Sequence, residues 1–294
     1  MEETSTNLIH EIREWQEKLF RRSIRRTRKM HQMEELLGTM SNSRCLEISS
    51  GDSVVSTRLR ALGGSWKTAT ATTEAAHSAA SSIGDSISFI HDGKLPFEDQ
   101  SFDMVVIADA LKEIALDGDF IYECHRVLKT DGWVVISETC RRPVSLVALL
   151  QRIFGVTPTT QGAQRNGYTN RELYAILKDG FDVPETITYS NGLFESAATF
   201  GELAQKVITG GPCWLVRKNP KQEDLYSYRQ LYTLAGLAYP LLWLLASLEF
   251  FPGHKLLVKS RRRPWRPRNQ PKLVDGRSIA EATINTKIGT AAPF

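Results

Sequence analysis

Cysteine is scarce in this sequence, and its four cysteines are widely separated. They form no Cys-x-x-Cys pair and have no cluster of histidines nearby, so neither a zinc site nor a disulfide framework is indicated. We therefore expect no bound metal and a reducing compartment, the cytoplasm. The opening stretch, MEETSTNLIHEIREW, also lacks the basic start and apolar core of a secretory signal.

Acidic residues are nearly absent from the end of the chain. From His254 onward the sequence contains ten lysines and arginines but only two acids, Asp275 and Glu281. This segment has a net charge of +8, whereas the whole chain carries +4. We expect residues 264–294 to form a basic, flexible tail with an anionic partner. Nucleic acid is not favoured as that partner, because no reader motif or base-stacking array accompanies the tail.

Charged residues are also missing between Leu231 and Leu248, in LYTLAGLAYPLLWLLASL. The stretch approaches the length of a membrane span, but Pro240 interrupts it. Three interpretations stay open: a buried helix pair that acts as a lid, an interfacial or re-entrant membrane segment, and a true span. With the arginines that follow, residues 231–268 predict docking to an anionic membrane surface, at the inner face of the membrane.

The N-terminal residues 1–42 predict a helical segment with one break. Its apolar residues recur at helical spacing: Leu8, Ile12, Trp15 and Leu19, then Met30, Met33, Leu37 and Met40. The basic run RRSIRRTRK, residues 21–29, lies between the two sets. It is interpreted either as a solvated helix face or as a contact with lipid phosphates or nucleic acid.

Short apolar runs then alternate with helix-length stretches over residues 43–190. Runs such as FDMVVIA (102–108) and WVVISE (133–138) are apolar almost throughout, which indicates strands of a parallel sheet covered on both faces. The sequence predicts a Rossmann-like, doubly wound α/β domain with a mostly parallel sheet. Ligands of such sheets bind beyond the carboxyl ends of the strands, so the residues after each run are candidates for a site.

Three segments in this order carry a family resemblance: LPFEDQSFDMVVIADALKEI (95–114), ECHRVLKTDGWVVISE (123–138) and GYTNRELYAILKDGFDV (167–183). They resemble the class I S-adenosylmethionine-dependent methyltransferases of the type 11-like branch, which carry LPF-x-D-x-SFD and E-x-x-RVLKPGG. The resemblance implies S-adenosyl-L-methionine as cofactor. It also implies a closing antiparallel strand pair, with residues 254–263 as the last strand and 191–253 as a helical insertion, a lid or a membrane-docking segment.

The loop after the first strand departs from the family pattern acid-x-Gly-x-Gly-x-Gly. In CLEISSGDS, Glu47 holds the acid and Gly51 the middle glycine, while Ser49 and Ser53 replace the outer two. The resemblance implies that this loop lies beneath the methionine part of the cofactor, where glycines permit close backbone approach.

Three further positions follow from the resemblance. Thr70 stands where the family has the acid for the ribose hydroxyls. The absence of that acid is expected to weaken binding of the cofactor by about tenfold to a hundredfold. Glu74, one helical turn on, is a substitute acid. Asp92 matches the acid near the adenine, or else caps a turn, and Ala108 lines the cofactor.

Candidate catalytic residues are few. Methyl transfer needs alignment, and it needs a base only where the acceptor loses a proton. Asp109 and Glu113 are four residues apart and would share a helix face, so either is a candidate base, the alternative being capping or surface acids. We expect His91 and His125 to be structural.

The function predicted from these residues is methyl transfer to a small-molecule or lipid-linked acceptor, at a membrane surface. The alternative is a methyltransferase-like pseudoenzyme, a binding or assembly protein that has lost its affinity for the cofactor. Ser49, Ser53 and Thr70 favour the alternative.

Overall fold

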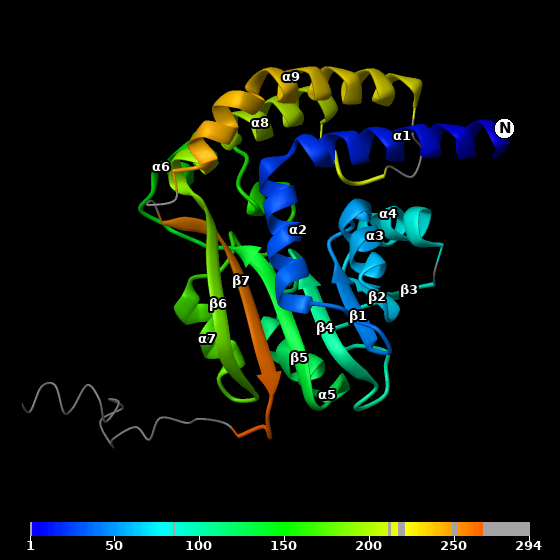
Figure 1. Cartoon of the computed structure of the whole chain (residues 1–294), viewed down its shortest axis with the longest axis vertical. Coiled ribbons are helices and arrows are strands. Elements are labelled where there is room, and N and C mark those ends of the chain that lie inside the picture. Colours follow the sequence, from blue (N-terminus) through cyan, green and yellow to red (C-terminus); the bar gives the residue numbers. More distant parts are fainter. Residues whose placement is uncertain (1, 85, 211–212, 217–220, 249–251, 267–294) are drawn as a thin grey trace, which may run out of the picture.

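The computed structural model describes residues 2–84, 86–210, 213–216, 221–248 and 252–266. Within these residues, seven strands form one sheet in the order β3-β2-β1-β4-β5-β7-β6 (Figure 1). The strands are β1 (Arg44–Ser49), β2 (Ser65–Thr70), β3 (Ile87–Phe89), β4 (Phe102–Ala108), β5 (Leu128–Thr139), β6 (Phe181–Asn191) and β7 (Gly253–Arg262). Only β7 runs antiparallel to its neighbours, so the predicted doubly wound, mostly parallel sheet is confirmed.

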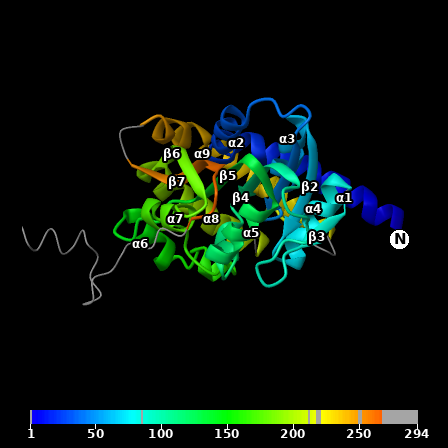
Figure 2. The same cartoon turned by 90° about the horizontal axis from the view of Figure 1, so that it is seen from below.

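Helices cover both faces of the sheet, as the apolar strands require (Figure 2). On one face lie α2 (Ile24–Leu37) and α3 (Ser53–Ala61), and on the other α5 (Asp117–Val127) and α7 (Asn170–Leu177). The remaining elements of the core are α4 (Thr73–Ile83), α6 (Leu146–Ile153) and the short 3₁₀ turns Leu111–Glu113 and Thr159–Gln161. The strands β1, β4 and β5 are buried between these layers, which fixes their carboxyl ends rigidly at one edge.

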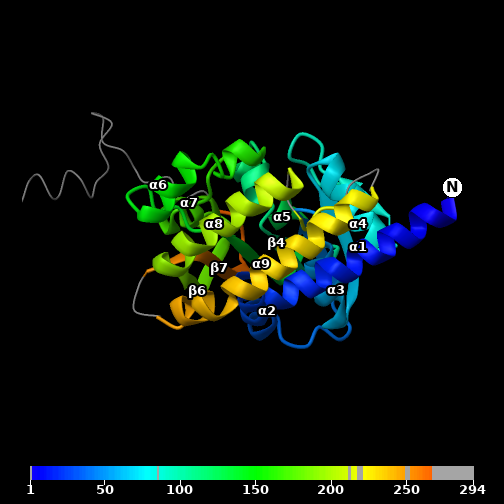
Figure 3. The ribbon, with the colours of Figure 1, turned by 90° about the horizontal axis from the view of Figure 1, so that it is seen from above.

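The break predicted in the N-terminal helix divides it into α1 (Glu2–Arg22) and α2. Ser23 lies at the break and caps α2, because its hydroxyl accepts a hydrogen bond from the Arg26 backbone N–H at 3.4 Å. Whereas α2 packs on the sheet, α1 leaves the core and lies alongside α9 (Gln222–Ala246) (Figure 3). Ile12 of α1 packs with Leu225 of α9 in the apolar cluster that joins the two helices.

The predicted insertion before the last strand contains α8 (Gly192–Thr209) and α9, which lie across the carboxyl edge of the sheet (Figures 1 and 3). No described helix is both long and apolar enough to cross a membrane. α9 buries Leu225, Tyr228 and Leu231 against its neighbours and leaves other apolar side chains exposed, Leu237 at 76% among them. It therefore covers the edge where the strands end and also presents an apolar outer face.

The basic residues after β7 lie at the far end of the molecule from α9. β7 begins at the carboxyl edge of the sheet and runs away from it for ten residues, roughly 30 Å (Figure 1). Trp265 packs against Tyr122 and His125. The predicted docking surface over residues 231–268 is thus not one continuous surface, because an antiparallel strand separates its two parts; residues 267–294 lie outside the described residues.

Candidate functional site

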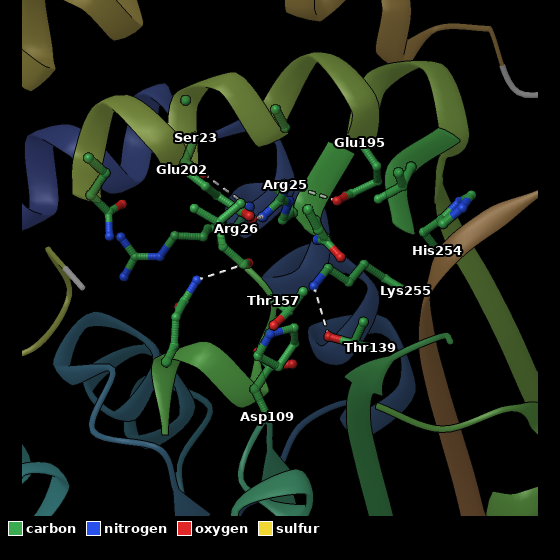
Figure 4. A pocket seen from close by; sticks show the side chains of 18 of the residues that line it. Ser23, Arg25, Arg26, Asp109, Thr139, Thr157, Glu195, Glu202, His254 and Lys255 are labelled. Atoms are coloured by element: carbon green, nitrogen blue, oxygen red, sulfur yellow. Dashed lines mark hydrogen bonds and ion pairs between the residues drawn. The ribbon is translucent and has the colours of Figure 1, made fainter. Parts of the chain in front are cut away.

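A pocket of about 1190 Å³ lies between the carboxyl edge of the sheet and the helices α1, α2, α8 and α9 (Figure 4). Its floor includes residues that follow four strands within two positions: Ser50, Thr72, Asp109 and Cys140. These are positions that the topology of a doubly wound sheet selects. The pocket exceeds the space that one drug-sized ligand needs, so it has room for a cofactor and an acceptor together.

The conformation of the β1 loop requires Gly51. Its φ is +88°, and a Cβ at this position would lie 2.8 Å from Ala75 Cα in α4 and 2.5 Å from Leu215 Cδ2. The Gly51 carbonyl accepts a hydrogen bond from Ser78 at 2.7 Å, and the Ser78 hydroxyl accepts one from the Val216 backbone N–H at 3.0 Å. The fold alone therefore explains this glycine, and the segment 213–216 covers the loop.

The other predicted loop residues are satisfied inside the protein. The Glu47 carboxylate is fully buried and accepts hydrogen bonds from Arg60 at 2.8 Å and from Ser56. Ser49 accepts a hydrogen bond from the Gly51 backbone N–H at 3.1 Å, and Ser53 donates to Gln16 at 3.2 Å. The two hydroxyls that replace glycines thus hold the loop and the N-terminal helix in place, and neither side chain lines the pocket.

Three of the remaining predicted cofactor positions do not line the pocket. Thr70 ends β2 as predicted, but it is fully buried and donates to the Thr72 carbonyl at 3.3 Å. Asp92 is exposed in a turn after β3, and Ala108 is buried in β4. The predicted substitute acid Glu74, in the first turn of α4, does line the pocket, as does Asp52 in the β1 loop.

Both candidate bases, Asp109 and Glu113, line the pocket, but they do not share a helix. Asp109 directly follows β4 with φ +56°, and only Leu111–Glu113 form a 3₁₀ turn. The Asp109 carboxylate binds the Lys29 ammonium at 2.7 Å. Burial opposes ionisation of Asp109, yet its lysine neighbours outweigh burial and hold its pKa well below the usual range. Asp109 is therefore a permanent anion and a poor base.

Glu113 has the opposite environment. Burial raises its pKa to about 7; Lys112 opposes this, and the carboxylates of Glu138 and Asp109 add to it. Among the described residues, its Oε2 atom has no hydrogen-bond partner although it is buried. A carboxyl group with this pKa and an unused oxygen at a pocket wall has the properties of a general base.

The basic run at residues 21–29 forms one wall of the pocket (Figure 4). Arg25 pairs with Glu195 at 2.8 Å and with Glu202, both on α8. Arg26 binds Asp52 in the β1 loop through two nitrogens, with Nε at 3.1 Å. Arg25 and Arg26 thus bind carboxylates of the protein itself and join α2 to α8 and to the β1 loop. They fit neither interpretation of the run from the sequence, a solvated helix face or a contact with lipid phosphates or nucleic acid.

A signal for this wall was present in the sequence. Arg26 and Lys29 follow helical spacing in α2 and continue the stripe that Met33 and Leu37 complete. The two cations thus lie on the face of α2 that points inward, where they need partners.

Two further pocket residues, His254 and Lys255, open β7 and were read in the sequence only as strand residues. The Lys255 ammonium donates a hydrogen bond to Thr139 Oγ1 at 3.2 Å. Burial lowers the pKa of both side chains. They lie beneath α8, on the side of the pocket away from the β1 loop (Figure 4).

Residues 46–136 match a family model described as a methyltransferase domain. A demethylmenaquinone methyltransferase of Staphylococcus epidermidis is 28% identical over 117 residues, which are 40% of this chain and 48% of that protein. The chain spans about half the length of this curated relative.

Solved structures share the fold. A geranyl diphosphate C-methyltransferase from Streptomyces coelicolor A3(2), solved with Mg²⁺, geranyl diphosphate and S-adenosyl-L-homocysteine, matches with a TM-score of 0.50 at 12% identity, over 81% of this chain and 78% of that one. A candidate sarcosine dimethylglycine methyltransferase from Galdieria sulphuraria matches with a TM-score of 0.51 at 13% identity, over 81% and 85%. At such identities the likeness shows the fold alone.

Proposed function

We propose that this chain, which belongs through residues 46–136 to the class I S-adenosylmethionine-dependent methyltransferases of the type 11 branch, is an enzyme that methylates a small-molecule acceptor. Glu113 carries the proposal. Its pKa of about 7 and its unused buried oxygen suit the removal of a proton from an acceptor hydroxyl, amine or acidic carbon at neutral pH.

Groups on the β1–β3 side of the pocket fit S-adenosylmethionine. Glu74 is the acid for the ribose hydroxyls, because Asp52, which also lines this side, is paired with Arg26. The Ser50 and Thr72 positions border the same space. Glu47, Ser49 and Ser53 act in this proposal by fixing the shape of the loop. When bound, the cofactor supplies an electrophilic methyl group on a sulfonium.

The acceptor occupies the other side, between Glu113 and the helices α8 and α9. These helices cover the pocket with mostly apolar side chains, which strengthens the charge interactions beneath them. Asp109 stays ionised beside Lys29, and its negative charge adds to burial in keeping the pKa of Glu113 raised, so that Glu113 takes the proton. Transfer then depends on alignment more than on covalent catalysis.

A lipid-linked acceptor at a membrane surface is the finer part of the proposal. Leu237, Leu241 and Leu244 follow helical spacing on α9 and are each more than half exposed. Leu241 also lines the pocket, so the apolar outer face of α9 continues into it. An apolar surface of this kind is favoured against lipid chains.

Liposome flotation tests the membrane contact. Changing Leu237 and Leu244 together to serine should abolish binding, whereas Tyr226→Ser, at an exposed position near the start of α9, should keep it. Since the arginines after β7 lie at the far edge of the sheet, binding should change little with salt. A chain that stays in the soluble fraction under all conditions removes this part of the proposal and leaves α9 as a lid.

The pseudoenzyme remains the second candidate because of one observation: Leu215 lies over Gly51, where the family places its cofactor loop. Formation of S-adenosylhomocysteine in the presence of a panel of hydroxylated aromatic and amphipathic acceptors distinguishes the two functions. The enzyme should release one S-adenosylhomocysteine for each methylated acceptor. If no acceptor or lipid extract yields product and S-adenosylmethionine does not bind, the binding protein replaces the enzyme.

A further inference from the structure

The acceptor side of the pocket contains a lysine that has no carboxylate of its own. Lys255 lines the pocket, and the one hydrogen bond described for its ammonium is to Thr139 Oγ1, at 3.2 Å. Among the described residues, no carboxylate oxygen lies within 4 Å of it. A lysine ammonium has three donors, so two of them remain for a ligand.

The carboxylates nearest in the electrostatic environment of Lys255 are already engaged. Glu195 pairs with Arg25 at 2.8 Å through one oxygen and accepts a hydrogen bond from Ser190 through the other. Asp109 pairs with Lys29 at 2.7 Å. A charge that is taken out of water without a partner is costly, and proteins place such charges where a ligand completes the pairing.

Two neighbours complete this corner: a cation, and a histidine whose pKa is lowered by burial, so that its ring is neutral. Arg142 lines the pocket in the turn after β5 and donates through Nε to the Gly253 carbonyl at 2.9 Å, which fixes it beside the start of β7. His254 lines the pocket next to Lys255 and lies beneath α8 (Figure 4). Apart from Glu195 and Glu202, which pair with Arg25, and Gln205, the wall contributed by α8 and α9 is apolar and includes Phe194, Ala198 and Leu242.

We propose that Lys255, with Arg142 and His254 beside it, forms a subsite for an anionic oxygen, a carboxylate or a phosphate, on an amphipathic acceptor whose apolar part lies against α8 and α9. The assignment of this ligand as the methyl acceptor rests on the proposed function. The subsite itself does not, because binding can be measured without any cofactor.

Four ten-carbon probes that differ only in the head group test the subsite: decanoate, decyl phosphate, decanol and decylammonium, titrated by calorimetry below their micelle concentrations. The wild type should bind decanoate or decyl phosphate at least about tenfold more tightly than decanol, and decylammonium most weakly. Whichever of decanoate and decyl phosphate binds more tightly shows whether the subsite prefers a carboxylate or a phosphate.

Lys255→Met keeps the length of the side chain and removes its charge, so the preference for the anion should fall to about twofold or less. Lys255→Arg keeps the positive charge and should therefore keep the preference for the anion. Lys259→Met is the matched control, since Lys259 is on the same strand but outside the pocket and donates to the Leu36 carbonyl; it should keep the preference.

Equal affinity for decanoate and decanol in the wild type, or an unchanged preference in a folded Lys255→Met variant, overturns the subsite. Absence of S-adenosylhomocysteine formation together with an intact anion preference would instead contradict the proposed function and leave the subsite standing.

Discussion

The two sides of the pocket differ in how their polar groups are used. At the β1–β3 side, Glu47, Ser49 and Thr70 are buried and hydrogen-bonded within the protein. At the β4–β7 side, within the part of the chain that the structure describes, Glu113 keeps an unused oxygen and Lys255 has no carboxylate partner. On the side that the family resemblance marks most strongly, the polar groups thus find their partners within the protein, whereas the groups with unused hydrogen-bonding capacity lie on the other side.

This difference distinguishes residues that the fold itself requires from residues that the fold does not explain. Gly51 is required by its φ of +88° and by the closeness of Ala75, whether or not a cofactor binds. A raised pKa and an unused oxygen at Glu113 have no such structural explanation, because a buried acid without a partner lowers stability. A group that costs stability and faces a pocket is better evidence for function than a retained glycine.

The largest expected effect comes from the reactive side. Glu113→Gln removes the proposed base without changing its shape, so methyl transfer to the best acceptor should fall by about 10² to 10⁴-fold while the affinity for S-adenosylmethionine stays the same. Single-turnover rates measure the change. Glu98→Gln, at an exposed position after β3, is the control and should match the wild type. A rate for Glu113→Gln within a factor of three of the wild type would assign the base elsewhere.

The ion pairs between the two sides give the next effect, on stability. Arg25→Met leaves Glu195 and Glu202 without their partner in a largely buried position, and we expect the free energy of unfolding to fall by about 3–5 kcal/mol. Arg21→Met, which removes an exposed pair with Glu17, should cost less than about 1 kcal/mol. Urea denaturation measures both, and equal small losses would show that α2 and α8 are held together by packing alone.

On the cofactor side, Glu74→Gln should weaken the binding of S-adenosylmethionine by about tenfold to a hundredfold, because a carboxylate that accepts hydrogen bonds is replaced by an amide. Thr70→Asp should not tighten binding, since Thr70 is buried away from the pocket. Calorimetry on the two variants compares the positions directly. Tighter binding by Thr70→Asp would mean that the cofactor reaches the end of β2.

The pH dependence tests the environment of Glu113. Only its ionised form accepts a proton, so the rate should rise with pH through about 7 and be about tenfold below its plateau at pH 6. Because the folded pKa lies above the unfolded value near 4.5, the contribution of Glu113 to stability is present below pH 4.5 and is lost as pH rises through 7.

The same shift predicts a difference in stability that depends on pH. At pH 8 to 9, Glu113→Gln should be more stable than the wild type by about 3 kcal/mol, and at pH 4 the two should be equal. Urea denaturation at both pH values measures the difference. Equal stability at pH 9 would place the pKa of Glu113 in the ordinary range.

The fold and the location of the site could be predicted from the sequence, but which charged side chains pair with each other could not. Apolar runs such as residues 102–108 define buried strands, and the topology then selects residues like Asp109 and Thr72 at their carboxyl ends. The pairing of Arg25 with Glu195 joins residues that are distant in the sequence, so no local pattern reveals it. Lys255 was missed because a lysine at the start of a strand is common.

Titration calorimetry with S-adenosylmethionine on the wild-type chain tests the central claim most directly. The account predicts saturable binding with a dissociation constant below about 100 μM, and a dissociation constant at least about tenfold higher in Glu74→Gln. Absence of heat and of any thermal shift at about 1 mM ligand would contradict the account and leave a methyltransferase fold that binds something else.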